Sequence, residues 1–487
     1  MAYEVVVVGG GIGGLTTAAV LCARGMNVCL IERQSELGGC LAPFEKFGYS
    51  FESGFGLYPG WKAGEIHDRI FAELPVAAPE VRQLEPAYSV RFSDRSEVFV
   101  SSDSAEFLDQ ISAGFPECAE AATSFFKEAE RVGQLVWDGL NPVLDLVGKP
   151  ISPEVFSSSQ IAHLLNDVTL LHMNGLSPRF RQFIDAQLQL FGQAAAPECA
   201  YLYACMLAAT REHGVSGIKG GARALSQALA DSIKKSGGTI RLNAQALRLA
   251  YDSSGRVSGV ILLTGEIVQA SVAVISNLPV WDTYGKLIGL NNTPSELRPR
   301  LKDTNSSGVY QLCLGLDDET AKAIARERIL AITNDDPEDL RESVLAFSMA
   351  PAWDNRAPEG KRAATVSVQV DVNDWFTYHV DESQHEEQDA AALESVWARL
   401  IAAIPELDES VELIETFTPR TTYESTRRKL GMVGGLPQTA ALFGPNSFSQ
   451  ETAFGNLFLV GDTVFPGAGA AAVSYGALAL ANRLTGK

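Results

Sequence analysis

The hydrophobic pattern at the start of the chain predicts a strand, a helix and a second strand. An apolar run from Val5 to Val8 enters a cluster of glycines at residues 9–14, and a stretch of small residues follows. The next apolar run, Val28 to Ile31, ends at Glu32. Short apolar runs bounded by glycine are typical of buried strands, so residues 5–32 are predicted to form a βαβ unit.

The glycine cluster has the spacing of a dinucleotide-binding turn. Gly9 would make the tight turn out of the strand, Gly11 would let the backbone approach a pyrophosphate, and Gly14 would allow close packing of helix on strand. The helix N-terminus would carry the phosphates, and Glu32 would accept hydrogen bonds from a ribose and disfavour a 2′-phosphorylated cofactor. The predicted nucleotide site comprises Gly9, Gly11, Ile12, Gly13, Gly14 and Glu32.

Between residues 76 and 213 the apolar positions recur with helical periodicity. The predicted helices are Ala105–Ile111, Ala121–Leu140, Phe180–Phe191 and Tyr201–Leu207, with apolar pairs at Leu164, Leu165, Leu170 and Leu171. Ordinary helical core explains any one of them. Their sum, a helical insert rich in Phe, Leu, Met and Tyr, also fits the wall of an apolar tunnel, and both interpretations stay open.

The pattern returns to strands after Gly220-Gly221. A helix is predicted over Ala224–Lys235, with strands at Thr239–Leu242, Leu247–Tyr251, Val257–Leu263 and Val268–Ile275. Turn residues separate these strands, so we predict that they extend the first sheet. Residues Asn243 to Leu247 would lie at a strand end on the adenine side of the nucleotide.

A second excursion carries strands and one further helix. The strands are predicted at Val309–Leu316, Val344–Ser348 and Ala364–Val372, and the helix at Ala390–Ile404. The loop Asp371–Gln388 holds many acids together with His379 and His385. Their irregular spacing favours a solvated surface over a metal site, so no metal is predicted.

The last stretch of the chain repeats the order of strand, glycine and helix. Residues Asn456–Val460 form an apolar run before Gly461-Asp462, and a turn with Gly467 and Gly469 precedes small residues over Ala470–Leu484. Asp462 would hold a polyol hydroxyl. The amides at the helix N-terminus suit a ring carbonyl that gains negative charge, such as the flavin N1/C2 locus.

Composition and charge narrow the class of protein. With 487 residues the chain has room for two or three domains and a large core. Its net charge of −20 argues against nucleic acid and against electrostatic docking on anionic lipid, while a peripheral apolar contact with a membrane stays open. The seven cysteines lack metal-type spacing and are predicted to be reduced thiols. With no bilayer-length apolar run and no charged leader, we expect a cytoplasmic location; the oligomeric state is not predicted.

Taken in order, these residues resemble the flavin oxidoreductases related to carotenoid desaturases and carotenoid isomerases, within the wider amine-oxidase-like group. The resemblance spans the chain and rests on Gly9 to Glu32, Gly38-Gly39, the aromatic segment Gly48–Gly54, Gly220-Gly221, Gly237-Gly238, Asn243, Thr418-Pro419 and Val460–Gly467. It implies an α/β fold with a Rossmann-like FAD-binding domain of the glutathione-reductase type and an inserted mixed α+β substrate domain. The first would comprise residues 1–75, 214–290 and 436–487, and the second residues 76–213 and 291–435.

The resemblance also implies a non-covalent FAD. Arg33 would join the nucleotide site on the ADP half, and Leu247 would approach the adenine through its backbone. Gly38 and Gly39 would bring amides to the same pyrophosphate, and Asp462 would hold the ribityl chain, with Gly461, Gly467 and Gly469 completing the site. Since no cysteine follows Cys313, the C-terminal thioether of some amine oxidases is excluded.

One departure separates this chain from the desaturases. They commonly place an arginine after the paired glycines, where this chain has Cys40, and the isomerase and saturase branch resembles it better there. The leading hypothesis is an FAD-dependent enzyme that isomerises, desaturates or saturates a long apolar polyene. The alternatives are an oxidase or dehydrogenase acting on a smaller metabolite, such as an amine, and a non-catalytic prenyl-chain chaperone, against which the intact Glu32 and Asp462 argue. The catalytic side chain is unknown: Lys219, Tyr423 and Lys429 are candidates by position only.

Overall fold

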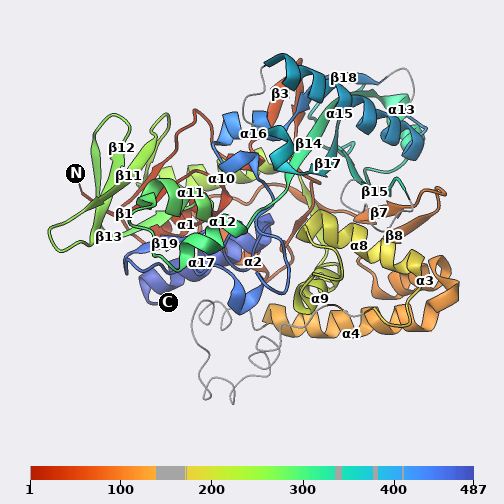
Figure 1. The fold of residues 1–487 in the computed structure, drawn as a ribbon, viewed down its shortest axis with the longest axis horizontal. Coiled ribbons are helices and arrows are strands. Elements are labelled where there is room, and N and C mark those ends of the chain that lie inside the picture. Colours follow the sequence, from red (N-terminus) through yellow and green to blue (C-terminus); the bar gives the residue numbers. More distant parts are fainter. Residues whose placement is uncertain (1, 139–170, 172, 335–342, 377–381, 408–410) are drawn as a thin grey trace.

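In the computed structural model, the first two apolar runs lie side by side as the parallel strands β1 (Tyr3–Val8) and β2 (Val28–Ile31). Helix α1 (Ile12–Ala23) connects them. The structure describes residues 2–138, 171, 173–334, 343–376, 382–407 and 411–487. Leu140, Leu164, Leu165, Leu170 and His379, which figure in the expectations above, lie outside these residues. Figure 1 shows two lobes, each built around one large sheet.

The first sheet collects strands from three distant parts of the chain. Its order is β10 (Thr239–Arg241), β2, β1, β13 (Ile267–Ser276), β12 (Val257–Leu262) and β11 (Ala246–Tyr251), with β19 (Leu457–Leu459) also paired to β13. β10, β2, β1, β13 and β19 run parallel, and β12 and β11 form antiparallel pairs at one edge. The strands predicted after residue 237 therefore do extend the first sheet.

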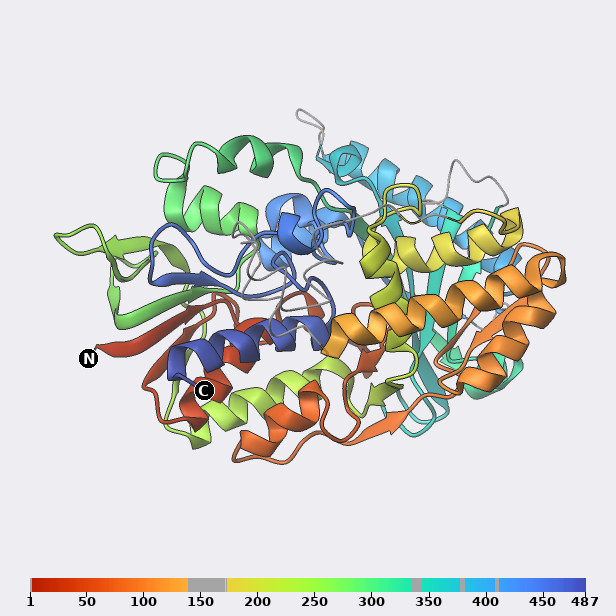
Figure 2. The same cartoon turned by 90° about the horizontal axis from the view of Figure 1, so that it is seen from below.

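Each face of this sheet is buried under a different layer. Val5 and Val7 pack with the helices α1, α10 (Gly221–Lys235) and α17 (Ala470–Thr485), whereas Val6 and Val8 pack on the opposite side. Burial on both faces explains why the runs are uniformly apolar rather than alternating. Figure 2 shows the three helices side by side beneath the sheet. This is the Rossmann-like α/β arrangement expected from the sequence.

The second lobe is built on a mixed sheet. Its order is β18 (Glu412–Phe417), β14 (Gly308–Asp317), β17 (Lys361–Val370), β16 (Val344–Met349), β15 (Arg328–Ile332), β7 (Tyr88–Arg91) and β8 (Glu97–Val100). Ile329 and Ala331 of β15 face the helix α15 (Glu382–Ala403), while Leu330 and Ile332 face α8 (Pro178–Gly192). The residue boundaries given above for the two domains stay a prediction.

Helices cover the face of this sheet that carries Leu330 and Ile332. They are α3 (Ser104–Gly114), α4 (Ala119–Asp138), α8 and α9 (Tyr201–Thr210), and they include the predicted helices over the described residues. The remaining elements are β3 (Phe44–Lys46), β4 (Tyr49–Phe51), β5 (Tyr58–Pro59), α2 (Ile66–Glu73), β6 (Val81–Gln83), β9 (Val215–Ile218), α11 (Val280–Asp282), the π-helix η3 (Thr283–Gly289), α12 (Leu297–Asp303), α13 (Asp318–Ile324), α16 (Pro419–Thr426) and the 3₁₀ turns η1 (Gly39–Leu41), η2 (Pro116–Cys118), η4 (Val372–Trp375), η5 (Lys429–Gly431) and η6 (Gly444–Asn446).

Two expectations about secondary structure were wrong. The segment from residue 76 was predicted to be helical, but it begins with β6, β7 and β8. The four-residue strands β7 and β8 are too short to show a period, and β15, the other partner of β7, lies far along the chain. The acidic loop predicted to reach Gln388 ends earlier, because α15 begins at Glu382, and acids are favourable near a helix N-terminus.

Two further findings concern the cysteines and the helices. All seven cysteines are free, and five of them are buried. Among the described residues, no helix has both the length and the apolar character required to cross a bilayer.

His67 of α2 should make stability depend on pH. Its ring is buried, stacks on Trp61 with a centroid distance of 4.5 Å, and has no hydrogen-bond partner for Nε2. Burial lowers the pKa of His67 from 6.5 to about 4. The unfolded chain therefore takes up a proton near pH 6.5 while the folded protein does not, so stability falls as the pH drops from 6.5 toward 4.

Between pH 7 and pH 5 this group should cost about 2 kcal/mol of unfolding free energy. Urea titrations of the wild type and of His67→Phe at both pH values measure the difference. The variant should lose about that part of the pH dependence. An unchanged pH dependence in the variant would mean that the buried neutral imidazole is not its source.

Candidate functional site

The first glycine turn leaves no space for side chains. Gly9 has φ +101°, and a Cβ added to Gly14 would lie 2.2 Å from the Gly9 carbonyl oxygen. Gly11 caps the N-terminus of α1, which directs its free amides away from the strand. Glu32 is buried behind this turn, where its Oε2 accepts a hydrogen bond of 2.7 Å from the Gly10 amide.

The paired glycines pack directly on this turn. The Gly38 amide donates to the Gly10 carbonyl over 2.9 Å, and a Cβ on Gly39 would lie 3.1 Å from the Gly11 Cα. Both glycines have positive φ, at +116° and +62°. The structure thus brings together the two glycine segments that the sequence assigned to one phosphate site, and it does so through backbone contacts that only glycine permits.

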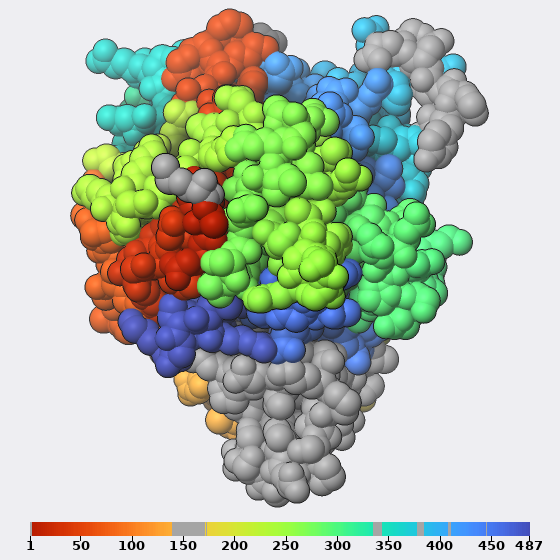
Figure 3. Space-filling view, turned by 90° about the vertical axis from the view of Figure 1, so that its left-hand side faces the viewer, coloured from red at the N-terminus to blue at the C-terminus, as the bar shows by residue number. Residues whose placement is uncertain are grey.

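The C-terminal element completes the same surface. A Cβ on Gly13 would lie 3.2 Å from the Gly461 amide nitrogen and 2.9 Å from Val473 Cγ1 of α17. Gly469 caps α17 with φ +98°. Gly467 has φ +116° and lies against the side chain of Gln438. Two helix N-termini, those of α1 and α17, therefore belong to one continuous site. In Figure 3 the N-terminal (red) and C-terminal (blue) segments lie against each other.

Asn277 lies between the two halves of the site, and sequence reasoning gave it no role. It follows β13, and its side chain fills the space where a Cβ on Gly11, Gly13 or Gly461 would lie, at 2.7, 2.6 and 3.0 Å. Its signal was present in the sequence, since it ends a predicted strand parallel to β1, and carboxyl ends of parallel strands meet at one edge.

Arg33 and Leu247 lie farther from this surface. The Arg33 guanidinium donates to the carbonyl oxygens of Glu424 and Ser425 at the end of α16. Leu247 lies on β11 with 46% of its surface exposed, whereas the Ala244 amide donates to the Glu32 carbonyl over 2.8 Å. Within the predicted segment 243–247, the first residues are thus the ones beside Glu32, and the roles of Arg33 and Leu247 stay predictions.

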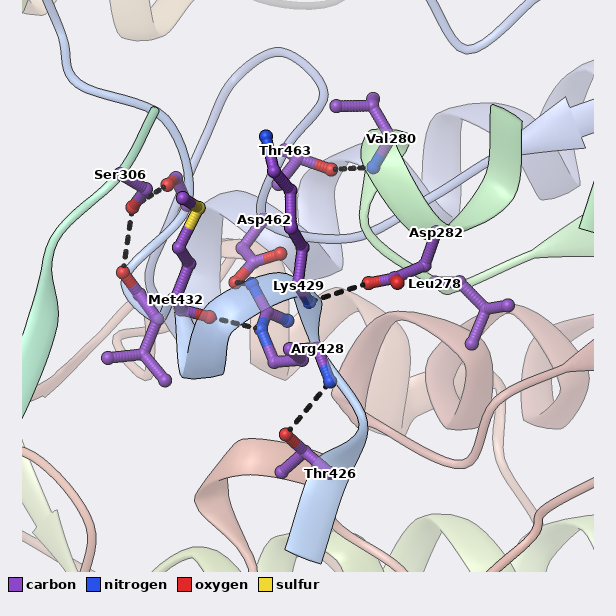
Figure 4. Close-up of polar contacts among 12 residues, drawn as sticks. Leu278, Val280, Asp282, Ser306, Thr426, Arg428, Lys429, Met432, Asp462 and Thr463 are labelled. Atoms are coloured by element: carbon purple, nitrogen blue, oxygen red, sulfur yellow. Dashed lines mark hydrogen bonds and ion pairs between the residues drawn. The ribbon is translucent and has the colours of Figure 1, made fainter. Parts of the chain in front are cut away.

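Asp462 is paired with an arginine that the sequence did not single out. Its Oδ2 accepts a hydrogen bond of 2.8 Å from Arg428 Nη2, and the two side chains are 16% and 11% exposed. Arg428 Nε donates to the Met432 carbonyl over 2.6 Å (Figure 4). Burial raises the pKa of the nearby Cys40 thiol, which the charge of Arg428 opposes. Cys40 is therefore a neutral thiol beside a buried ion pair.

The three candidate catalytic residues lie in different surroundings. Lys219 pairs with Glu80 on the surface at 2.8 Å, and Tyr423 packs on the Phe376 ring at 5.6 Å. Lys429 lies beside the Asp462 loop, with Nζ 5.5 Å from the Trp281 ring centre (Figure 4). Burial lowers the pKa of Lys429. Of the three, Lys429 alone lies next to the predicted site.

Aromatic side chains from the helical cover surround the loop before Gly467. Phe465 contacts Phe443 with ring centroids 5.5 Å apart, and Phe443 contacts Tyr203 of α9 at 6.0 Å. The same apolar cluster contains Val132 of α4 and Met206 of α9. A second aromatic group, Phe55, Tyr88 and Phe191, has centroid distances of 5.7 to 6.3 Å. The side chains of the first cluster, called the apolar wall around Phe465 below, pack the helical cover against the loop before Gly467.

Comparisons with known proteins agree with this geometry. The model of the flavin containing amine oxidoreductase family matches residues 12–468. The chloroplastic prolycopene isomerase of Daucus carota is 24% identical over 99% of this chain and 80% of its own. The all-trans-retinol 13,14-reductase of Rattus norvegicus is 23% identical over 95% of this chain and 82% of its own.

Solved structures share the fold. That of an oxidoreductase from Methanosarcina mazei superposes with a TM-score of 0.66 at 17% identity and covers 98% of this chain and 99% of its own. At this level of identity the likeness concerns the arrangement of the two lobes.

Proposed function

Because the chain belongs to the family of flavin-containing amine oxidoreductases, we propose that it is an FAD-dependent oxidoreductase that isomerises, desaturates or saturates a long apolar polyene. The family assigns the flavin. The choice of FAD, its non-covalent binding and the polyene substrate are our proposals.

The shape of the site supports FAD over a smaller flavin. The glycine turn of α1, with Glu32 behind it, fits a nucleotide half, and the Gly467–Gly469 turn at α17 fits a ring half. Gly13 and Gly461 join the two without a gap. Cys40, the cysteine next to the paired glycines, is kept protonated by burial, which supports non-covalent binding.

The apolar wall around Phe465 is the observation that carries the substrate proposal. Phe465 precedes the turn at Gly467 by two residues and packs against α4 and α9 through Phe443 and Met206. A substrate lying over the flavin would meet rings and aliphatic groups, which suits a hydrocarbon chain. Two relatives are named for prolycopene and for retinol, both polyenes.

The cofactor would supply the electron-transfer chemistry, and the chain would bind and orient. The amides at the α1 N-terminus would hold phosphate, and Glu32 and Asp462 would accept hydrogen bonds from sugar and polyol hydroxyls. The amides at the α17 N-terminus would stabilise negative charge on the ring. Phe443 and Phe465, which are buried beside the Gly467 turn, would keep water away from the ring half of the cofactor.

We expect the purified protein to be yellow, and FAD to be released on denaturation and identified by chromatography. Under anaerobic conditions, a poly-cis carotenoid should yield a geometric isomer or a product with two more hydrogens when a chemical reductant is present, or a product with two fewer hydrogens when a chemical electron acceptor replaces the reductant. An aliphatic amine incubated with the oxidised protein in air should release no peroxide. Peroxide from the amine without turnover of the polyene would reject the substrate proposal, and a colourless protein that FAD does not stabilise against heat would reject the cofactor.

A further inference from the structure

We propose that Arg428 binds the diphosphate of the cofactor. It would supply the positive charge that the two glycine segments of the predicted phosphate site, residues 9–14 and Gly38-Gly39, lack. This inference rests on the proposed FAD. Arg428 follows α16, far along the chain from both glycine turns, and folding places its guanidinium between Asp462 and the Cys40 segment. In Figure 4 it lies at the centre of the polar contacts around Asp462.

The guanidinium is held at one edge and open at the other. Nε donates to the Met432 carbonyl over 2.6 Å and Nη2 to Asp462 Oδ2 over 2.8 Å. Among the described residues Nη1 has no hydrogen-bond partner. A guanidinium carries five donors in a rigid plane, so fixing one edge directs the remaining donors without further loss of freedom. Such a fork suits bidentate binding of phosphate oxygens.

The negative charges around the predicted phosphate site favour a nearby cation such as Arg428. Glu32 lies behind the first glycine turn and Asp462 follows the last strand, and both are carboxylates. A diphosphate adds further negative charge, which backbone amides would balance only by their dipoles. Arg33 is turned toward the carbonyls of α16, and Lys429 Nζ lies over the Trp281 ring. In the part of the chain that the structure describes, Arg428 lies beside Asp462 and close to Cys40, and its Nη1 has no partner there.

The position of Cys40 is consistent with a charge supplied by Arg428. Cys40 directly follows the paired glycines that pack on Gly10 and Gly11. The Cys40 side chain carries no positive charge, so in the proposal Arg428 supplies the charge. The phosphate contact would thus be shared between a backbone turn near the start of the chain and a side chain from its last quarter.

Binding of FAD to the flavin-free protein tests the inference. The fluorescence of FAD is titrated at low and high salt against the wild type, Arg428→Met, Arg428→Lys and Arg427→Met. Arg428→Met should weaken binding about 10- to 100-fold, as expected for a lost hydrogen bond to a charged group, and should flatten its salt dependence. Arg428→Lys should recover part of the affinity. The exposed neighbour Arg427 is the matched control, and its variant should bind like the wild type.

Two further variants separate phosphate binding from support of Asp462. Asp462→Asn breaks the ion pair but keeps the cation, so its FAD binding should retain the salt dependence that Arg428→Met loses. In the double variant Cys40→Arg/Arg428→Met, the new arginine should restore salt-dependent binding. Equal losses with an unchanged salt slope in Arg428→Met and Asp462→Asn would overturn the inference. A wild type that binds no FAD would instead reject the proposed cofactor.

If Arg428→Met does not fold, the lysine variant decides. Full loss of the salt slope in a folded Arg428→Lys would contradict a charge contact, whereas a weaker affinity with the slope retained would support it.

Discussion

Replacing Gly14 with alanine should leave the protein without its flavin and reduce its resistance to heat. The added Cβ would lie 2.2 Å from the Gly9 carbonyl oxygen and 3.1 Å from Asn277 Cβ. Neither neighbour can move freely, because Gly9 directly follows the buried strand β1 and Asn277 lies between the two halves of the site. Overpacking of this kind typically costs about 1–3 kcal/mol, and here it falls on the turn that must present amides to phosphate.

Flavin absorbance per mole of purified protein and thermal unfolding measure the two effects. Gly285→Ala is the control, since a Cβ at Gly285 would meet no atom within 4 Å and its φ is not positive. That variant should keep its flavin and its melting temperature. Full flavin content in Gly14→Ala would show that α1 can shift away from β1, and would contradict the close packing described above.

Replacing Arg211 with methionine should destabilise the helical cover by about 3–5 kcal/mol, the range for removing one partner of a buried ion pair. Arg211 follows α9 and pairs with Glu130 of α4, with side chains 4% and 9% exposed. It also donates to the Ser101 carbonyl over 2.8 Å and lies 4.4 Å from the Phe107 ring centre. Its loss leaves Glu130 buried without its cation, and burial already raises the pKa of that carboxyl.

The neighbouring pair Arg131 and Glu128 provides the control. It lies on the same helix α4, but its side chains are 61% and 53% exposed. Arg131→Met should therefore change the unfolding free energy by less than about 1 kcal/mol in urea titrations. The double variant Arg211→Met/Glu130→Leu should recover much of the loss, because no charge is left buried. A double variant as unstable as Arg211→Met alone would assign the loss to packing instead.

The strands and glycine turns of the first lobe could be predicted from short stretches of the sequence. The runs at Val5–Val8 and Val28–Ile31 are buried on both faces, so their composition carried the information. The glycine turns could be located because positive φ and close backbone contact exclude other residues, as at Gly14 and Gly39. These features are written into a few consecutive residues.

Contacts between residues that are far apart in the sequence could not be predicted from short stretches. Asp462 was singled out, but nothing near it in the sequence indicates Arg428 as its partner. The strand β7 was missed because it pairs with β15, more than two hundred residues later, and β8 joins the sheet only through β7. The core and tunnel interpretations of the helical insert both stay open, and composition alone could not indicate that the insert packs beside the C-terminal turn, where Phe465 lies.

The covering of α1 by α17 also orders events during translation. The residues of α1 from Ile12 to Cys22 are all buried, and Leu478 and Ala481 of α17 belong to the cluster that buries them. A growing polypeptide that has not yet reached residue 470 therefore leaves the side of α1 that faces α17 open to water, although α10 can already cover the other side. Complete burial of α1 has to wait until α17 has left the ribosome.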